Sequence, residues 1–230
     1  MRFVNHRGED FLVAHFQGWS LKRNPVAATT FMAAKIGVPA GITIVTFATA
    51  DILADAALPR QLDAAGVAYL NPALDVVPWR NPLKITLLLE TLPAVRTEYV
   101  LALDGRDVLL CGPLDTIVAR LASYPGIDVL FGAQKTPFPP VPIEDIASRQ
   151  ELGPFAHLNA GTMFGKTDAV DRFYRHAAAI DEPTYSEQFL VRIAFAEHSD
   201  GVWFDHRCRI FQYFGTRAEI VEDDGTFMVR

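Results

Sequence analysis

The sequence predicts a single α/β domain built on a mixed, mostly parallel β-sheet flanked by helices. Two observations support this fold class. From residue 42 onward, short runs of β-branched and aromatic residues alternate with helical patterns, as in consecutive βαβ units. In addition, the 230 residues are 50% hydrophobic and 21% charged, which suits one medium-sized core better than two large domains or a disordered chain.

Strands are predicted where apolar, β-branched and aromatic residues form short continuous or alternating runs. The first such run, FLVAHF, lies near the N-terminus, ahead of the βαβ pattern. The predicted strands cover residues 11–16, 42–49, 67–70, 99–104, 127–133 and 158–164, followed by the runs VWFD and RIFQYF.

Helices are predicted where apolar residues recur every three or four positions. Asn81 followed by Pro82 marks a helix start, because Asn caps helices and Pro fits the first turn; Pro113 marks another. Five prolines within residues 137–154 instead predict a long binding loop or lid over 134–156. The predicted helices cover residues 25–36, 51–65, 82–92, the segment after Pro113, 167–180 and 186–198.

Charge and composition limit the kinds of binding partner and the cellular location that we expect for this protein. The net charge of −6 provides no basic face for a polyanion, so nucleic acid is not expected as a partner. Residues 1–24 lack the features of a secretion signal, and no apolar stretch is long enough to span a membrane. We therefore expect a cytoplasmic protein. Cys111 and Cys208 form no paired motif and are interpreted as buried small hydrophobes, with a disulfide as the alternative.

The string YVLALDGRD at residues 99–107 carries the strongest functional signal. An apolar strand ends in Asp104, and Asp107 follows one turn later. Ligands of open α/β sheets bind beyond the carboxyl ends of strands, where paired carboxylates could hold a metal ion against a phosphate. The simpler alternative is a buried strand that ends in turn-forming aspartates.

Six strings, in order, resemble the glycosyltransferase domain of the procollagen lysyl hydroxylases and related collagen glycosyltransferases, which has the GT-A fold. This resemblance implies a GT-A core over residues 42–230 and a metal-dependent transferase that moves a hexose from a UDP-sugar to an acceptor hydroxyl. The matching strings are VTFATAD (45–51), KITLLLETL (84–92), LALDGRDVLL (101–110), HLNAGTMFG (157–165), SEQFL (186–190) and FDHRCRIFQYF (204–214).

The resemblance also implies a manganese site. It implies that Asp104 and Asp107 are two of the metal ligands. The third ligand in the family is a histidine in a His-x-x-Gly motif, which is followed by a phosphate-binding lysine. That motif is expected near the C-terminus, but here it stands near the N-terminus, in AHFQGWSLK. His15 would then be the metal ligand, Gly18 the residue of close approach and Lys22, one position late, the phosphate contact. The alternative for His15 is a strand-edge histidine with a backbone partner.

The misplaced motif predicts a circularly permuted chain. FMVR at the C-terminus and RFVN at the N-terminus both resemble the strand that precedes the motif. Residues 1–24 would be the permuted C-terminal segment and residues 25–41 a new connection to the core. Two alternatives stay open: the segment is the tail of a lost upstream copy, or it completes the site of a neighbouring chain in a segment-swapped dimer or other homo-oligomer.

Further donor-site residues follow from the resemblance. Ala48 and Thr49 would meet the uracil base, and Lys84 would add positive charge beside the diphosphate. Lys84 has the alternative of a solvated surface lysine. The string WRNPLK, which leads into Lys84, replaces the glycines that are usual in the family. Trp79 in this string could stack on a base or pack in the core.

Asn159 and Gly161 match a family motif whose small residues let the sugar approach the backbone; a glycine bend in a strand is the alternative. Glu187 falls where the family carries the end of an aspartate run near the reacting carbon, and could instead cap a helix with Ser186. Only DEPTYSE remains of that run. Asp205 and His206 are weaker metal-ligand candidates.

We therefore predict a glycosyltransferase that uses Mn²⁺ or another divalent cation, with a UDP-sugar as donor and a peptide, glycan or small molecule as acceptor. Collagen is not the expected acceptor, because neither a secretion signal nor a hydroxylase domain is present. One alternative is a noncatalytic nucleotide-sugar-binding or interaction module. Another is a nicotinamide-dependent Rossmann enzyme, which is ranked last because TFATAD replaces the glycine-rich turn after the first long strand.

Overall fold

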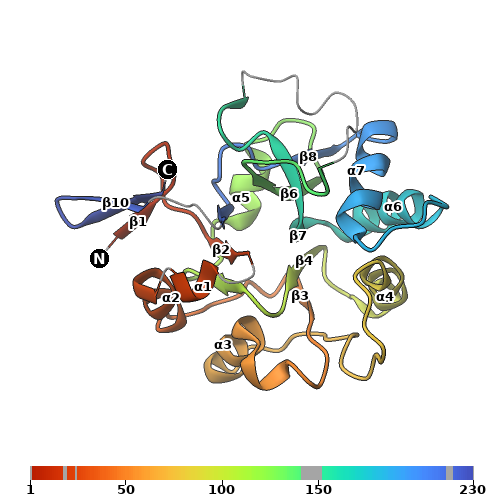
Figure 1. Cartoon of the computed structure of the whole chain (residues 1–230), viewed down its shortest axis with the longest axis horizontal. Helices are drawn as coiled ribbons and strands as arrows, with labels where there is room; N and C mark the ends of the chain where they lie inside the picture. Colours follow the sequence, from red (N-terminus) through yellow and green to blue (C-terminus); the bar gives the residue numbers. More distant parts are fainter. Residues whose placement is uncertain (1, 18–19, 24, 141–151, 216–219, 230) are drawn as a thin grey trace.

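The computed structural model describes residues 2–17, 20–23, 25–140, 152–215 and 220–229 (Figure 1). Its centre is a five-stranded mixed sheet with the order β3-β4-β7-β6-β8. β3 pairs with β4, and β6 with β8, in parallel, whereas β7 is antiparallel to both of its neighbours. Four strands therefore share one direction, as predicted. The strands are β3 (Ile42–Phe47), β4 (Tyr99–Asp104), β6 (Val129–Gln134), β7 (His157–Lys166) and β8 (Val202–Phe204).

Helices cover both faces of the central sheet because alternate side chains of each strand point to opposite faces. On β4, Val100 and Ala102 pack toward α4, α6 and α7, which lie together on the right in Figure 1. Leu101 and Leu103 pack on the other face, with α3 and α5. The helices are α3 (Ala57–Ala65), α4 (Leu83–Thr91), α5 (Ile117–Ala122), α6 (Thr167–Ala178) and α7 (Glu187–Glu197).

A second sheet brings an N-terminal strand between two later parts of the chain. β2 (Val13–Phe16) lies between β5 (Val108–Leu110) and β9 (Phe211–Phe214), antiparallel to the first and parallel to the second. All four residues of β2 are buried. This central position ties the N-terminal segment to the end of β4, because β5 begins a few residues after β4 ends.

The two ends of the chain meet in a third sheet, on the left of Figure 1. β1 (Arg2–Val4) pairs in parallel with β11 (Thr226–Val229), with Phe3 opposite Phe227, and β10 (Ile220–Asp223) completes the sheet. The two segments whose sequences resemble the same strand therefore lie side by side. Two short helices, α1 (Ser20–Arg23) and α2 (Pro25–Met32), follow β2.

Several predicted elements differ in extent. Residues 67–70 make only an isolated bridge between Leu70 and Val45, and the helix expected after Pro113 begins at Ile117. The Asn81 side chain does not cap α4, because it accepts a hydrogen bond from Trp79 instead. The predicted helix over 51–65 divides into a 3₁₀ turn, η1 (Leu53–Asp55), and α3; a second 3₁₀ turn, η2 (Leu92–Ala94), extends α4.

Two further expectations can be compared with the structure. Cys111 and Cys208 are free cysteines, so the disulfide alternative is wrong. Within the described part of the chain, every helix is too short or too polar to cross a membrane. Much of the predicted loop over 134–156 falls in residues 141–151, outside the described residues.

Candidate metal and nucleotide site

The register of β2 against β5 brings His15 to the two predicted aspartates. His15 lies opposite Val108, the residue that follows Asp107, and the Phe16 N–H donates to the Asp107 carbonyl at 2.7 Å. His15 Nε2 is 3.6 Å from Asp107 Oδ1 and 3.9 Å from Asp104 Oδ2. The three predicted metal ligands thus meet within one chain.

The donor set fits a divalent cation. One ligand atom from each of His15, Asp104 and Asp107 lies within 4.8 Å of the others, and no other group of three or more His, Cys, Asp or Glu side chains does so among the residues that the structure describes. Ligands at about 2.0–2.2 Å from a shared ion lie at such separations from one another. An imidazole and two carboxylates suit Mn²⁺ better than Mg²⁺, which prefers oxygen ligands and water.

Asn159 orients the His15 ring. Its Oδ1 lies 3.1 Å from His15 Nδ1 and also accepts the Gly161 N–H at 3.0 Å, while its Nδ2 donates to Gln134 Oε1 at 2.7 Å. Because Oδ1 is an acceptor, Nδ1 must carry a proton, and Nε2 is then the ring nitrogen that faces the carboxylates and would give up its proton to bind a metal ion. Asn159 is buried behind His15, and its predicted place near the sugar stays a prediction.

Gly161 allows β7 to approach the site. A Cβ atom at this position would lie 2.5 Å from His15 Cε1 and 2.7 Å from Asp104 Oδ2. Both distances are shorter than real Cβ contacts, so any larger residue would displace a predicted ligand. The cluster therefore requires glycine at position 161. A bend in the strand, the alternative considered above, would not by itself explain why a Cβ atom cannot fit there.

Lys84 is half-buried and ion-paired beside the cluster, so the alternative of a solvated surface lysine is wrong. Its Nζ lies 2.5 Å from Asp104 Oδ1 and 2.6 Å from Glu187 Oε1, and its side chain is 13% exposed. Burial lowers the pKa of Lys84, but the two carboxylates outweigh burial and raise it above its ordinary value. Glu187 thus forms an ion pair at the start of α7, and Ser186 makes no side-chain cap there.

Charge neighbours also shift the pKa values of the ligands. Burial lowers the pKa of His15, but the hydrogen bond and charge of Asp107 and the charge of Asp104 raise it above its ordinary value. Burial raises the pKa of the Asp104 carboxyl, although Lys84 opposes this shift. The cluster therefore combines opposite charges at close range in a partly desolvated place, as sites that bind charged ligands commonly do.

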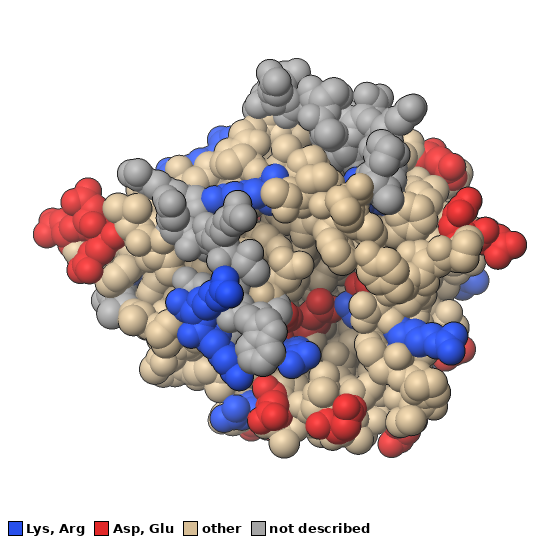
Figure 2. Space-filling model, in the orientation of Figure 1, with Lys and Arg blue, Asp and Glu red and all other residues tan. Residues whose placement is uncertain are grey.

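A cavity of about 420 Å³ opens beside the cluster. Asp104, Asp107 and Lys84 line it together with Thr49 and Trp79. Figure 2 shows acidic side chains in a hollow near the middle of one face, with basic side chains beside them. Thr49 thus lines the same cavity as the two carboxylates, and its contact with uracil stays a prediction. Sequence reasoning missed three lining residues with polar side chains, Asp51, Asn81 and Arg106. Arg106 could have been found, because it stands between the two aspartates in the sequence.

Two predicted contacts, Ala48 and Lys22, do not line the cavity. Ala48 is fully buried, and its backbone N–H and carbonyl both bond the Asn71 side chain, at 3.1 and 2.8 Å. The backbone N–H and carbonyl of Ala48 are therefore already bonded within the protein, and these bonds stabilise the end of β3. Lys22 has an exposed position on α1 and does not line the cavity. Gly18 lies outside the described residues.

Asp205 has a structural role. It is fully buried, accepts the Tyr124 hydroxyl, and its two carboxylate oxygens accept the backbone N–H groups of Arg209, Ile210 and Phe211 at 2.7–3.0 Å. These bonds fold the turn that leads into β9. His206 lies next to it, against Tyr124 and Trp203. The weaker metal-ligand candidates are therefore wrong for this cluster.

Asp205→Ala is expected to lower the free energy of unfolding by about 3 kcal/mol, because it leaves buried N–H groups without an acceptor. Urea denaturation measures this change. The matched control is Asp168→Ala on α6, whose exposed carboxylate pairs with Arg172 and bonds the backbone of the first helical turn, so that a change of about 1 kcal/mol or less is expected. Equal stability of the two variants would contradict the structural role of Asp205.

Comparisons with known proteins complete the description. No protein-family model matches the chain, and neither does any curated protein. Among solved structures, the chain is similar to a glycosyltransferase involved in the glycosylation of the major capsid of PBCV-1. That similarity has 16% sequence identity and a TM-score of 0.43, and it covers 75% of this chain and 82% of the other.

Proposed function

We propose that this protein is a divalent-metal-dependent glycosyltransferase that transfers a hexose from a UDP-sugar to an acceptor hydroxyl. One observation carries the proposal. The imidazole of His15 meets Asp104 and Asp107, which line a 420 Å³ cavity, and its Nε2 is turned toward the carboxylates. The sequence resemblance described above supplies the donor class.

Each residue has a defined part in this proposal. Asp104, Asp107 and His15 would hold Mn²⁺, which as a Lewis acid stabilises the charge on a departing diphosphate. Thr49 and Trp79 line the part of the cavity proposed for the nucleoside. Lys84 holds a positive charge between Asp104 and Glu187, and its charge favours an anionic leaving group.

The reaction exchanges one bond for another. The acceptor hydroxyl oxygen forms a bond to the anomeric carbon, the bond from that carbon to the β-phosphate oxygen breaks, and UDP leaves with the electron pair. The hydroxyl proton passes to a base or to solvent. Glu187 stays our proposal for the group nearest the sugar, where its negative charge would stabilise positive charge on the anomeric carbon.

We also propose that the chain is circularly permuted. The parallel pairing of β1 with β11 supports this, because a permutation requires the old ends to be connected and the new ends to lie near each other. In this proposal β2 is the ancestral last strand of the site, and residues 25–41 are the new connection.

A second candidate function is a noncatalytic nucleotide-sugar-binding module. The ion pair between Glu187 and Lys84 favours it, because a carboxylate engaged in this way is less available for chemistry at the sugar. The loss of the aspartate run before Glu187 points in the same direction. This candidate predicts binding of the donor without turnover.

Calorimetric titration of UDP, with and without Mn²⁺, tests the proposal, together with release of UDP from a panel of UDP-hexoses. We expect binding and UDP release that both require Mn²⁺ and disappear with EDTA. Asp168→Asn, an exposed carboxylate change on α6, is the control and should behave like wild type. Metal-dependent binding without UDP release would favour the binding module. UDP binding that is independent of the cation would contradict the metal-dependent transferase, and absence of UDP binding would contradict both candidates.

A further inference from the structure

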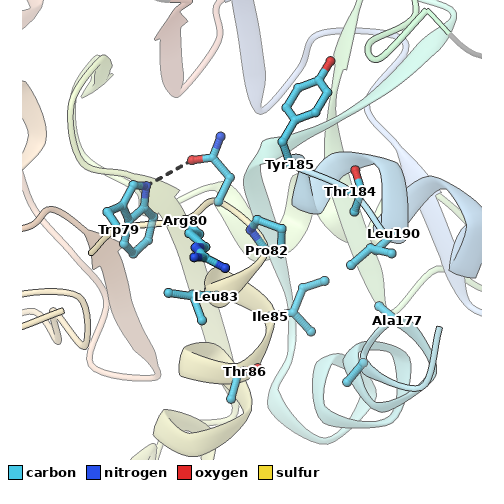
Figure 3. A pocket seen from close by; sticks show the side chains of 12 residues that line it. Trp79, Arg80, Pro82, Leu83, Ile85, Thr86, Ala177, Thr184, Tyr185 and Leu190 are labelled. Atoms are coloured by element: carbon cyan, nitrogen blue, oxygen red, sulfur yellow. Dashed lines mark hydrogen bonds between the residues drawn. The ribbon is translucent and has the colours of Figure 1, made fainter. Parts of the chain in front are cut away.

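A larger cavity adjoins the candidate site. It has a volume of about 810 Å³ and lies between the first turn of α4, the end of α6 and the segment that leads into α7 (Figure 3). Ile85 on α4, Ala177 on α6 and Leu190 on α7 give it an apolar lining. Its volume is within the range of about 300–1,000 Å³ typical of small-molecule sites.

Two aromatic rings stand at different sides of this cavity. Figure 3 shows Trp79 near the start of α4 and Tyr185 before α7. The Trp79 Nε1–H donates to Asn81 Oδ1 at 3.0 Å, which holds the indole in place. Tyr185 is 67% exposed, and its ring meets the edge of Phe138 at a centroid distance of 6.4 Å. An exposed tyrosine beside a cavity offers an apolar face to a ligand and a hydroxyl to its rim.

The cavity adjoins the cavity of the candidate metal site, and the two share lining residues. Trp79 and Asn81 line both this cavity and the 420 Å³ cavity that contains Asp104 and Asp107. Leu83 and Ile85 line the larger cavity, whereas Lys84 between them reaches Asp104. The first turn of α4 therefore lies between the two cavities, with Trp79 and Asn81 in contact with both.

The polar lining indicates the chemistry of the occupant. Arg80 contributes a positive charge, and Thr86 and Thr184 contribute hydroxyl groups. No carboxylate occurs among the described residues that line the cavity. A cationic acceptor, such as a lysine-rich peptide, would find no counter-charge there, whereas a neutral or anionic molecule rich in hydroxyl groups would find donors, acceptors and aromatic faces.

We propose that this cavity binds the acceptor, and that the acceptor is a neutral or acidic oligosaccharide. The inference rests on the proposed glycosyltransferase function. The C–H faces of a pyranose ring would pack on Trp79 and Tyr185, and Arg80 would bond sugar hydroxyls or a uronate. The acceptor hydroxyl would enter the smaller cavity past Trp79 and Asn81.

Sugar transfer from the UDP-hexose that wild type accepts tests the inference, with cellobiose, lactose, digalacturonate and a lysine-rich hydroxyl-bearing peptide as acceptors. We expect transfer to a saccharide and none to the peptide. Tyr185→Ala and Arg80→Ala should raise the acceptor KM roughly tenfold, whereas Tyr185→Phe, which retains the ring, should stay within about twofold of wild type. The controls are Val26→Ala, an exposed apolar change on α2, and Arg175→Ala, an exposed arginine change on α6.

Two further measurements separate this inference from the proposed function. Affinity for UDP with Mn²⁺ should be retained in Tyr185→Ala, because Tyr185 does not line the smaller cavity. If wild type binds no UDP, the proposed function fails; saturation-transfer NMR of wild type and Tyr185→Ala with the same saccharides then tests the cavity directly. Absence of saccharide transfer and binding, equal behaviour of Tyr185→Ala and wild type, or preference for the peptide would overturn the inference.

Discussion

Asp107→Ala and His15→Ala are each expected to lower Mn²⁺ affinity on the order of 100-fold or more, and to reduce UDP affinity in Mn²⁺ to its metal-free value. Removal of a residue that only supports a metal ligand typically lowers metal affinity about 10–100-fold. These two residues are proposed to supply ligand atoms themselves, so a larger loss is expected. Their atoms lie 3.6 Å apart in the cluster. Calorimetric titration with Mn²⁺, and with UDP at saturating Mn²⁺, measures both effects.

Thermal unfolding distinguishes a metal ligand from a structural residue. Wild type should gain stability on addition of Mn²⁺, since an ion that binds only the folded state raises its apparent stability. The two variants should lose this gain. Asp107→Ala should not melt much below metal-free wild type, because it removes one of two neighbouring carboxylates. A variant that is destabilised without metal and retains the Mn²⁺-dependent gain would contradict the assignment.

Mixing the two variants tests whether the site belongs to one chain. His15, Asp104 and Asp107 meet within a single chain in the structure. An equimolar mixture of His15→Ala and Asp107→Ala should therefore recover no metal-dependent UDP binding. In a segment-swapped dimer, some mixed pairs would contain one complete site, so partial recovery would show that the N-terminal segment serves a neighbouring chain.

Gly161→Ala is expected to lower Mn²⁺ affinity at least tenfold and to destabilise the fold by about 1–3 kcal/mol. The new methyl group would overlap His15 Cε1 and Asp104 Oδ2, so either the two ligands or β7 must move. Mn²⁺ titration measures the first effect and urea denaturation the second. This change removes no charge and no hydrogen-bonding group, and its effect therefore reports the packing of the site alone.

Gly41→Ala is the matched control for this prediction. Nothing lies within 4 Å of a Cβ atom at Gly41, and the position is exposed. We expect wild-type Mn²⁺ affinity and a change in stability below about 1 kcal/mol. If Gly161→Ala bound Mn²⁺ as tightly as this control, the observed closeness of β7 to the ligands would be irrelevant to metal binding.

Local patterns predicted most of the secondary structure. The span of β4 agrees with the predicted strand because its apolar run is bounded by polar residues at both ends. The helix that extends from Thr167 also agrees closely, since its apolar residues follow a clear helical spacing. The extents were less accurate at 67–70 and after Pro113, where hydrogen bonds from distant segments decide whether a short run extends into a regular element.

The side-chain partners of the site could not be predicted in the same way. Asn159 bonds His15 across 144 positions, and Lys84 bonds Glu187 across 103. The resemblance identified all four as site residues, but it did not pair Asn159 with His15 or Glu187 with Lys84. Their observed partners depend on the register between β7 and its neighbours and on where α7 begins. Neither feature follows from the local spacing of residues.

The sequence by itself predicted an α/β chain in which a buried strand is followed by two aspartates. It could do so because the spacing of apolar residues, and the polar residues at the end of an apolar run, depend only on neighbouring positions in the chain. The tertiary structure alone decided that β2 enters between β5 and β9, which brings His15 to those aspartates and Asn159 behind its ring. The physical reason is that backbone pairing between strands far apart in the chain sets which side chains meet, and that pairing is a collective result of the whole core.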